Sequence, residues 1–390
     1  KVEYFQGDLA GILQVAGSIA FTKRGGEVVT LSNDTTREVT SLAIGMSNVY
    51  GFAGIGGYWE TNSEGRIDGS SRDESAIGLA VEDLDIGAVF MLDTNLSNPA
   101  AYFAAQANLE MAGLVGIDGV TAEVNDLMLD LNQALSGDMA VVDFSQSSYE
   151  LPDGSVAAGY RIETGDDASP IILEFDERLI RLQGEAAFDL FGMATLDGAV
   201  EIKLTDEEFT LFIDAAASVG GFLEGKGRAL LVADSSGLAA SFGLSEINLD
   251  LGAVELNVDS LQFVMNTTGN VVRYDVPVEF QESRDLPAVL EISNIPPQKE
   301  TPADFYLGLS GSGDLSLLGA LNLDGNFSIL LSETDGEVLT ELTLDMTLDL
   351  PVFEELRATG TLGLVAGSDA GIYGALSLGG SGEDSVLIQA

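Results

Sequence analysis

The chain has 390 residues, of which 63 are Asp or Glu and only 16 are Lys or Arg, so that its formal net charge at pH 7 is −47. A surface of this charge repels nucleic acid and anionic lipid, because contacts to phosphates require clustered Lys and Arg. Cys and His are absent, which excludes disulfides, thiolate nucleophiles and imidazole ligands, and no apolar run approaches the roughly 18 residues that a membrane-spanning helix needs.

Pairs of glycines six residues apart, with aliphatic residues before and between them, mark four places along the chain. They are Gly11 and Gly17, Gly113 and Gly119, Gly192 and Gly198, and Gly319 and Gly325. A second string, GLAVEDLDIGAV from Gly78, returns as GLSEINLDLGAV from Gly243. Self-similarity of this kind predicts a tandem array of structural repeats. We expect the four glycine pairs to occupy equivalent strand–turn–strand positions.

The order of these strings predicts three repeats. A first long repeat covers residues 1–175, a second and shorter one covers 176–300, and a truncated third covers 301–390. The Pro-rich stretch 295–302 is the clearest boundary, because Pro cannot donate to a β-ladder. The series starts and ends inside a repeat, so we expect self-association or contacts with neighbouring repeats of the same protein.

The spacing of apolar residues predicts strands. In residues 342–350, five aliphatic or Met side chains alternate with Thr and Asp, as in a strand with one buried face. The Asp-Gly dipeptides predict tight turns. Only residues 98–114 and 121–135 are rich enough in Ala, Leu and Met to hold one short helix each. We therefore predict an all-β chain of elongated tandem repeats with little helix, built as antiparallel β-sandwiches or as a solenoid-like rod.

Residues 60–68 contain the most distinctive local chemistry. Oxygen-bearing side chains alternate before a Gly and an aliphatic residue, which is the spacing of a calcium loop. The predicted ligands are Glu60, Asn62, Glu64, Asp68 and Glu74. The segment departs from the usual loop, because Glu replaces Asp at positions one and five and Ser71 stands at position twelve. An acidic surface loop would explain the same residues.

Two other segments invite a binding interpretation. Trp59, the only Trp, follows Tyr58 in a Gly-rich stretch and could stack on a sugar, although such residues are more often core or edge anchors. Residues 220–227 nearly match a phosphate-binding loop, but Gly227 stands where a hydroxyl must hold Mg²⁺. We therefore expect no nucleotide site.

The first repeat also carries a resemblance. The strings VAGSIAF, SNVYGFAGIGG, GLAVEDLDIGAVFML, LVGIDGVTAEVNDLMLDLNQA and VVDFSQ fall between Gly11 and Phe191. This stretch resembles a long tandem repeat of giant acidic, adhesin-like secreted proteins of aquatic bacteria. The resemblance implies a secreted or cell-surface location and an adhesive or matrix role, and it supplies no catalytic residues.

These observations predict a structural or adhesive repeat segment of a large extracellular, filament- or matrix-forming protein, with calcium as the one expected cofactor and no enzymatic activity. The alternative is a carbohydrate- or lipid-binding β module. An aliphatic groove left open would favour lipid, and an exposed Trp59–Tyr58 platform would favour glycans as partners. A third alternative is a carboxylate-based polysaccharide hydrolase, which needs two carboxylates about 5–10 Å apart in a cleft.

Overall fold

The computed structural model describes residues 1–95, 99–136, 140–151, 153–252, 254–317, 321–350, 353–366, 370–380 and 385–389. Strands make up 70% of the structure and helices 3%, which confirms the all-β prediction. Contacts divide the chain into two compact units. Unit 1 comprises Lys1–Phe191 and Val200–Glu208, and unit 2 comprises Gly192–Ala199 and Phe209–Ala390.

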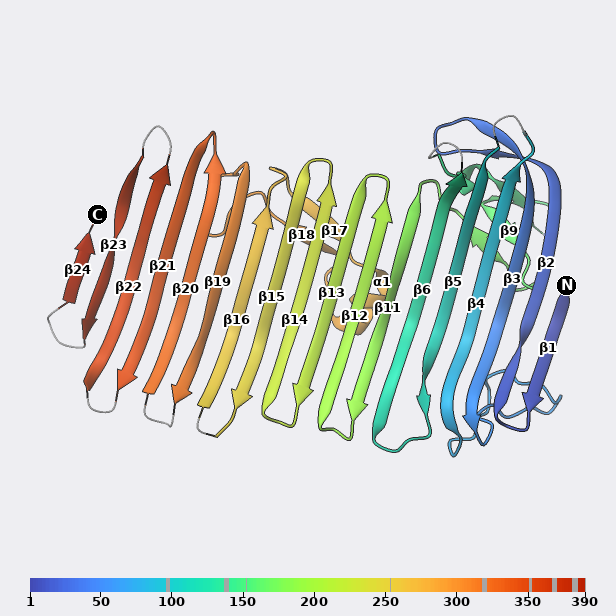
Figure 1. The fold of residues 1–390 in the computed structure, drawn as a ribbon, viewed down its shortest axis with the longest axis horizontal. Helices are drawn as coiled ribbons and strands as arrows, with labels where there is room; N and C mark the ends of the chain where they lie inside the picture. Colours follow the sequence, from blue (N-terminus) through green and yellow to red (C-terminus); the bar gives the residue numbers. More distant parts are fainter. Residues whose placement is uncertain are drawn as a thin grey trace. The chain divides into compact units, whose positions relative to one another are not determined.

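Unit 1 contains an antiparallel sheet in which each long strand pairs with the next one. These strands are β1 (Val2–Leu9), β2 (Leu13–Thr30), β3 (Thr36–Ile55), β4 (Ile77–Asp93), β5 (Ala101–Val115), β6 (Val120–Ser136) and β11 (Leu179–Leu190) (Figure 1). The two predicted helices are wrong, because residues 98–114 and 121–135 fall largely in β5 and β6. Their Ala and Leu residues alternate between the faces of the sheet instead of forming a helical stripe.

An insert between β6 and β11 packs on one face of this sheet. It holds the 3-10 turn η1 (Phe144–Gln146) and two short hairpins. The hairpins pair β7 (Ser148–Glu150) with β8 (Val156–Ala158), and β9 (Tyr160–Ile162) with β10 (Ile171–Leu173). Buried residues of the insert and of β2–β5 form the main core of unit 1, including Val39, Met91, Tyr102, Phe144, Ile162 and Leu173. Gly45 permits this close packing, since a Cβ there would lie 2.3 Å from the carbonyl oxygen of Glu163.

Unit 2 repeats this plan with other strands, each of which pairs with the next from β14 onward. They are β14 (Leu223–Asp234), β15 (Gly237–Asp250), β16 (Val254–Asn266), β19 (Phe305–Leu317), β20 (Leu321–Thr334), β21 (Glu337–Leu350), β22 (Phe353–Ala366), β23 (Gly371–Gly380) and β24 (Ser385–Gln389). β13 (Glu208–Val219) precedes them, and β12 (Ala194–Thr205) contributes residues to both units.

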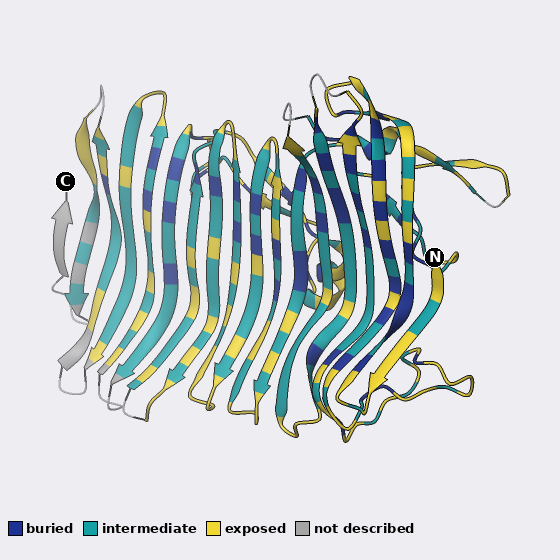
Figure 2. Cartoon of the chain, turned by 45° about the vertical axis from the view of Figure 1, so that its right-hand side comes forward, coloured by how far each residue is buried: buried dark blue, intermediate teal, exposed yellow. Residues whose placement is uncertain are grey.

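The insert of unit 2 lies between β16 and β19. It holds helix α1 (Val278–Arg284) and the hairpin of β17 (Val272–Asp275) with β18 (Val289–Ile292). Its apolar side chains bury one face of the sheet around Phe212, Leu230, Val232, Tyr274 and Phe280. Figure 2 shows that dark blue, fully buried residues occupy only parts of the long strands. Among the described residues, the layer over each sheet is therefore an insert and not a second sheet of long strands, as a sandwich would have.

Turn geometry explains part of the glycine pattern. Ala10–Gly11, Phe191–Gly192 and Gly220–Gly221 all have φ between 54° and 68° at both residues, which is the left-handed conformation of tight hairpin turns. Six residues after the second turn residue, Gly17, Gly198 and Gly227 lie within strands. The string 220–227 is therefore a hairpin turn and strand that repeats the glycine pattern.

The remaining glycine predictions have mixed outcomes. Gly113 lies in β5 and Gly119 in the turn before β6, so the expected equivalence is wrong for this pair. Gly319 lies outside the described residues, whereas Gly325 lies in β20. The Asp-Gly prediction is also wrong at Gly198 and Gly325, which lie inside strands. Gly325 is needed there for close approach, because a Cβ would lie 2.3 Å from the carbonyl oxygen of Asp345.

The compact units divide the chain within residues 192–208. This division follows from packing and carries no information on sequence repetition. The repeat boundaries 1–175, 176–300 and 301–390 therefore stay predictions.

Candidate functional site

Several oxygen atoms of the predicted calcium loop accept hydrogen bonds from other residues of the same loop. Asn62 Oδ1 accepts hydrogen bonds from the main-chain nitrogens of Glu64 and Arg66 at 2.9 and 3.0 Å, and its Nδ2 donates to Asp68 Oδ2 at 2.7 Å. Hydrogen bonds from Ser70 and Asn62 lower the pKa of Asp68. These bonds are those of a self-closed surface loop.

The five predicted ligands are only partly brought together. Asn62, Glu64 and Asp68 line one cavity, while Glu60 accepts a hydrogen bond from the Ser71 hydroxyl. Within the described ranges, no group of three or more His, Cys, Asp or Glu side chains is arranged to hold a metal ion. Calcium binding by Glu60, Asn62, Glu64, Asp68 and Glu74 therefore stays a prediction.

The Trp59–Tyr58 pair is part of a core and not an exposed platform. Trp59 is 2% exposed and Tyr58 6% exposed. The Trp59 indole donates to the carbonyl oxygen of Gly51 at 2.8 Å, and Gln14 bonds both main-chain polar groups of Trp59. The pair therefore anchors the loop between β3 and β4 to the sheet. Glycans gain no binding surface from these two rings.

The second face of the unit 2 sheet is aliphatic and aromatic across many strands. Strand registers place apolar side chains directly opposite one another, in rows that cross the sheet. One row consists of Phe242, Phe263, Leu309, Ile329, Leu342 and Leu362. A second row consists of Leu249, Leu256, Leu315, Leu323 and Leu348. We call the side chains of these two rows, with Ile213 of β13 and Leu244 of β15, the apolar face.

Solvent reaches the apolar face. Phe242 is 41% exposed, Ile329 39% and Ile213 38%. The neighbouring residue Phe212 points to the opposite side of β13 and is fully buried beneath the insert. The insert therefore covers one face of the sheet and leaves the apolar face open.

The covered face has a different chemistry outside the apolar cluster that the insert buries. Its rows contain hydroxyl, amide and carboxylate side chains. One of them consists of Gln262, Ser310, Ser328, Thr343 and Thr361, and another of Ser260, Ser312, Asn326, Asp345 and Thr359. Neither row of the apolar face contains a charged residue. The two faces therefore differ, and the carboxylate of Asp345 lies in a row on the face that also carries the insert.

Unit 1 has the same two-sided design. A row of directly opposed residues crosses its sheet on the side away from the insert, and consists of Phe21, Ile44, Ala88, Ala105, Leu131 and Ile180. Phe21 is 62% exposed and Ile44 is 37% exposed. An open apolar face is thus a feature of each unit by itself.

A trough deepens the apolar face of unit 2 at β13–β15. Its volume is about 400 Å³. Small residues of β13 and β14 line it, among them Ala215, Ala217, Gly225 and Gly227, together with the larger side chains of Phe242, Leu244 and Ile247. Because these small residues carry little or no side chain, they leave a depression between bulkier neighbours.

Comparison with protein-family models gives no match for this sequence, and comparison with curated proteins gives none either. Among the described residues, no helix is both long and apolar enough to cross a membrane. The function is therefore inferred from the geometry of the two units.

Proposed function

We propose that this chain is a lipid-binding β module that holds acyl chains on its open apolar face. The observation that carries the proposal is the uninterrupted row from Phe242 to Leu362, which crosses the sheet without a charged side chain. Exposed apolar patches larger than a few hundred Å² mark interaction sites on soluble proteins. An aliphatic groove left open is also the feature expected to favour lipid over glycan.

The exposed side chains of the apolar face support an apolar ligand. Acyl chains laid on this face would remove exposed surface of Phe242, Ile329 and Ile213 from water, and each buried CH₂ group would contribute about 0.8 kcal/mol.

Electrostatics favours acyl chains over two other occupants. A second copy would bring together two chains that each carry a formal charge of −47. An intact anionic bilayer would repel the same charge. The acyl part of a neutral lipid carries no charge and meets no charged residue on either row of the apolar face. The trough over β13–β15 could enclose part of such an acyl chain between side chains.

A titration with a neutral fluorescent monoacylglycerol, below its micelle concentration, tests the proposal on the full chain. We expect saturable binding, and we expect Phe242→Asn with Leu244→Asn to weaken it about tenfold or more. Ser241→Asn is the matched control, because Ser241 neighbours Phe242 in β15 and faces the other side of the sheet. Circular dichroism confirms that each variant is folded.

Three results would contradict the proposal. The parent chain could fail to bind the probe, or the control and the double variant could weaken binding equally. Light scattering could also show that the parent is a dimer without bound probe, and that the double variant is a monomer. In that case the apolar face is covered by a second copy.

A structural or adhesive repeat of a secreted or cell-surface protein is our second candidate. The recurrent left-handed turns at Gly11, Gly192 and Gly221 support it, because they build similar hairpins along the chain. This candidate includes calcium binding by the loop at residues 60–68 and self-association of the chain.

Thermal melts in calcium and in NaCl of matched ionic strength test calcium binding, with Glu60→Gln plus Glu64→Gln as the loop variant. A calcium-induced rise in Tm that the variant loses would support calcium binding by the loop. No rise in the parent would contradict the calcium prediction. We do not propose the hydrolase alternative.

A further inference from the structure

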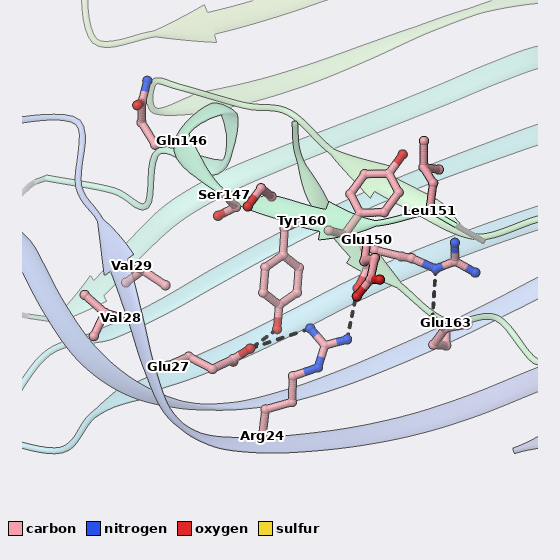
Figure 3. Close-up of a pocket in the computed structure, with 13 residues that line it drawn as sticks. Arg24, Glu27, Val28, Val29, Gln146, Ser147, Glu150, Leu151, Tyr160 and Glu163 are labelled. Atoms are coloured by element: carbon pink, nitrogen blue, oxygen red, sulfur yellow. Dashed lines mark hydrogen bonds and ion pairs between the residues drawn. The ribbon is translucent and has the colours of Figure 1, made fainter. Parts of the chain in front are cut away.

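A second cavity lies in unit 1, between β2 and the insert, and is unrelated to the apolar face. Its volume is about 820 Å³, which is within the range of small-molecule sites. Figure 3 shows side chains from β2 and from the insert around it. We call it the polar pocket, because Arg, Glu, Gln, Ser and Tyr side chains make up most of its lining.

One wall of the polar pocket is a fixed network on β2 and β9. The guanidinium carbon of Arg24 lies 5.3 Å from the ring centroid of Tyr160, and Arg24 Nη2 donates to the carbonyl oxygen of Arg161 at 3.4 Å. The Tyr160 hydroxyl donates to Ser41 Oγ at 3.1 Å, and Ser41 donates to Glu27. Burial raises the pKa of Tyr160, so its phenol stays protonated at neutral pH. This wall is therefore preorganised.

A second stacked guanidinium, that of Arg161, also lines the polar pocket. Arg161 lies over the ring of Tyr149, with 5.9 Å between the guanidinium carbon and the ring centroid. Its Nε donates to Glu163 Oε1 at 2.9 Å. Its two terminal nitrogens have no acceptor in the part of the chain that the structure describes, and together they carry four N–H donors in one plane.

The hydrogen-bond donors and acceptors that line the polar pocket indicate the class of ligand. Glu27, Glu150 and Glu163 line the polar pocket beside the two Arg side chains, so carboxylates outnumber guanidinium groups. An anionic ligand would therefore be repelled, and an acyl chain would leave these polar groups unpaired. Sugar hydroxyls both donate and accept, and a sugar ring is uncharged. Such a ligand can accept from Arg161 and donate to the carboxylates at the same time.

We propose that the polar pocket of unit 1 binds a neutral saccharide, with Arg161 and Tyr149 as its main contact residues. This site is independent of the acyl-chain site. A panel of neutral di- and trisaccharides with different linkages, titrated into the full chain by calorimetry, is the direct test. At least one member should bind with a Kd below about 10 mM.

A matched pair of variants identifies the site. Arg161→Met removes the donors and keeps an apolar stem, and should weaken saccharide binding about tenfold or more. Arg273→Met is the control, because Arg273 also lies in a short hairpin and also pairs its Nε with a Glu oxygen at 2.9 Å, in this case of Glu291. Arg273→Met should leave binding unchanged.

Several outcomes would overturn the proposal. They are the absence of binding by every saccharide of the panel, equal weakening by Arg161→Met and Arg273→Met, and binding of acidic saccharides in preference to neutral ones. The double variant Phe242→Asn with Leu244→Asn must bind the saccharide as the parent does. This requirement separates a failure of the polar pocket from a failure of the acyl-chain site.

Discussion

The two faces of the unit 2 sheet are made by the same strands, yet they have different chemistry. On one face, apolar residues such as Phe212 and Leu230 form a cluster that the insert buries, and Ser, Thr, Asn and Asp occupy rows outside this cluster. On the other face, apolar residues such as Phe242 and Ile329 continue across the strands and remain exposed to solvent. On the first face, the insert buries the apolar residues. On the second face, the apolar residues extend over several strands and stay exposed among the described residues.

This difference separates the residues that hold the fold from the residues that are available to a ligand. Phe212 stacks on Tyr274 and Phe280 of the insert, with ring centroids 5.1 and 6.1 Å apart. Phe242 instead lies opposite Ala229 and Phe263 of the adjacent strands. A ligand on the apolar face would supply the contacts that the insert supplies on the covered face.

The largest expected effect tests this division directly. Phe212→Ala should lower the free energy of unfolding by about 3–5 kcal/mol, because it leaves a cavity among buried rings. Phe242→Ala should lower it by about 1 kcal/mol or less, since water already reaches that side chain. Urea unfolding of both variants measures the difference. Equal losses would mean that the apolar face contributes to a core and is not free for a ligand.

A second prediction concerns the turns that bring residues of neighbouring strands into register. Gly221 has φ 68°, and a Cβ added there would meet no atom within 4 Å, so Gly221→Ala should cost about 1 kcal/mol through backbone strain alone. Gly243 is the control, because it also has open space around it and needs no positive φ. Gly243→Ala in β15 should be neutral or slightly stabilising. Urea unfolding that gives the same cost for both would contradict the role of the left-handed turn.

The smallest expected effect concerns a cluster of acidic residues in unit 1. Burial, and then repulsion by Asp83 and Asp166, raises the pKa of Asp85 above its ordinary value of 3.8. The folded state therefore disfavours the charged form, and this cost is present above the folded pKa and absent below 3.8. Asp85→Asn should raise stability at pH 7 by less than about 1 kcal/mol, because solvent screens a partly exposed carboxylate.

The pH dependence provides the control for this prediction. The gain from Asp85→Asn should shrink as the pH falls through the folded pKa of Asp85, as followed by thermal melts between neutral and acidic pH. A gain that is independent of pH would show that packing, and not charge, accounts for it. The Asn side chain can still accept the hydrogen bond that Asp85 Oδ1 receives from the main-chain nitrogen of Asn48 at 2.8 Å.

Local sequence was sufficient for the strands but not for several sites. Leu342, Leu344, Met346 and Leu348 alternate with polar residues and lie together on one face of β21, as their spacing predicts. The Ala-rich stretch 98–114 is misleading, because Ala104 of this stretch is buried in the core of unit 1 as part of β5 and not on a helix. Asn62 carries an oxygen of the right kind for calcium, but its hydrogen bonds to the loop backbone depend on the folded turn.

The sequence by itself determined the all-β class, the period-two strands and the excess of negative charge, because each of these follows from residue types and short spacings. Only the tertiary structure decided which face of each sheet the insert covers, since that depends on contacts between residues far apart in the chain. The same holds for the polar pocket, where Arg24 and Tyr160 meet although they are widely separated in the sequence. Strand register then converted single apolar residues into continuous rows, because pairing places side chains from successive strands opposite one another on one face.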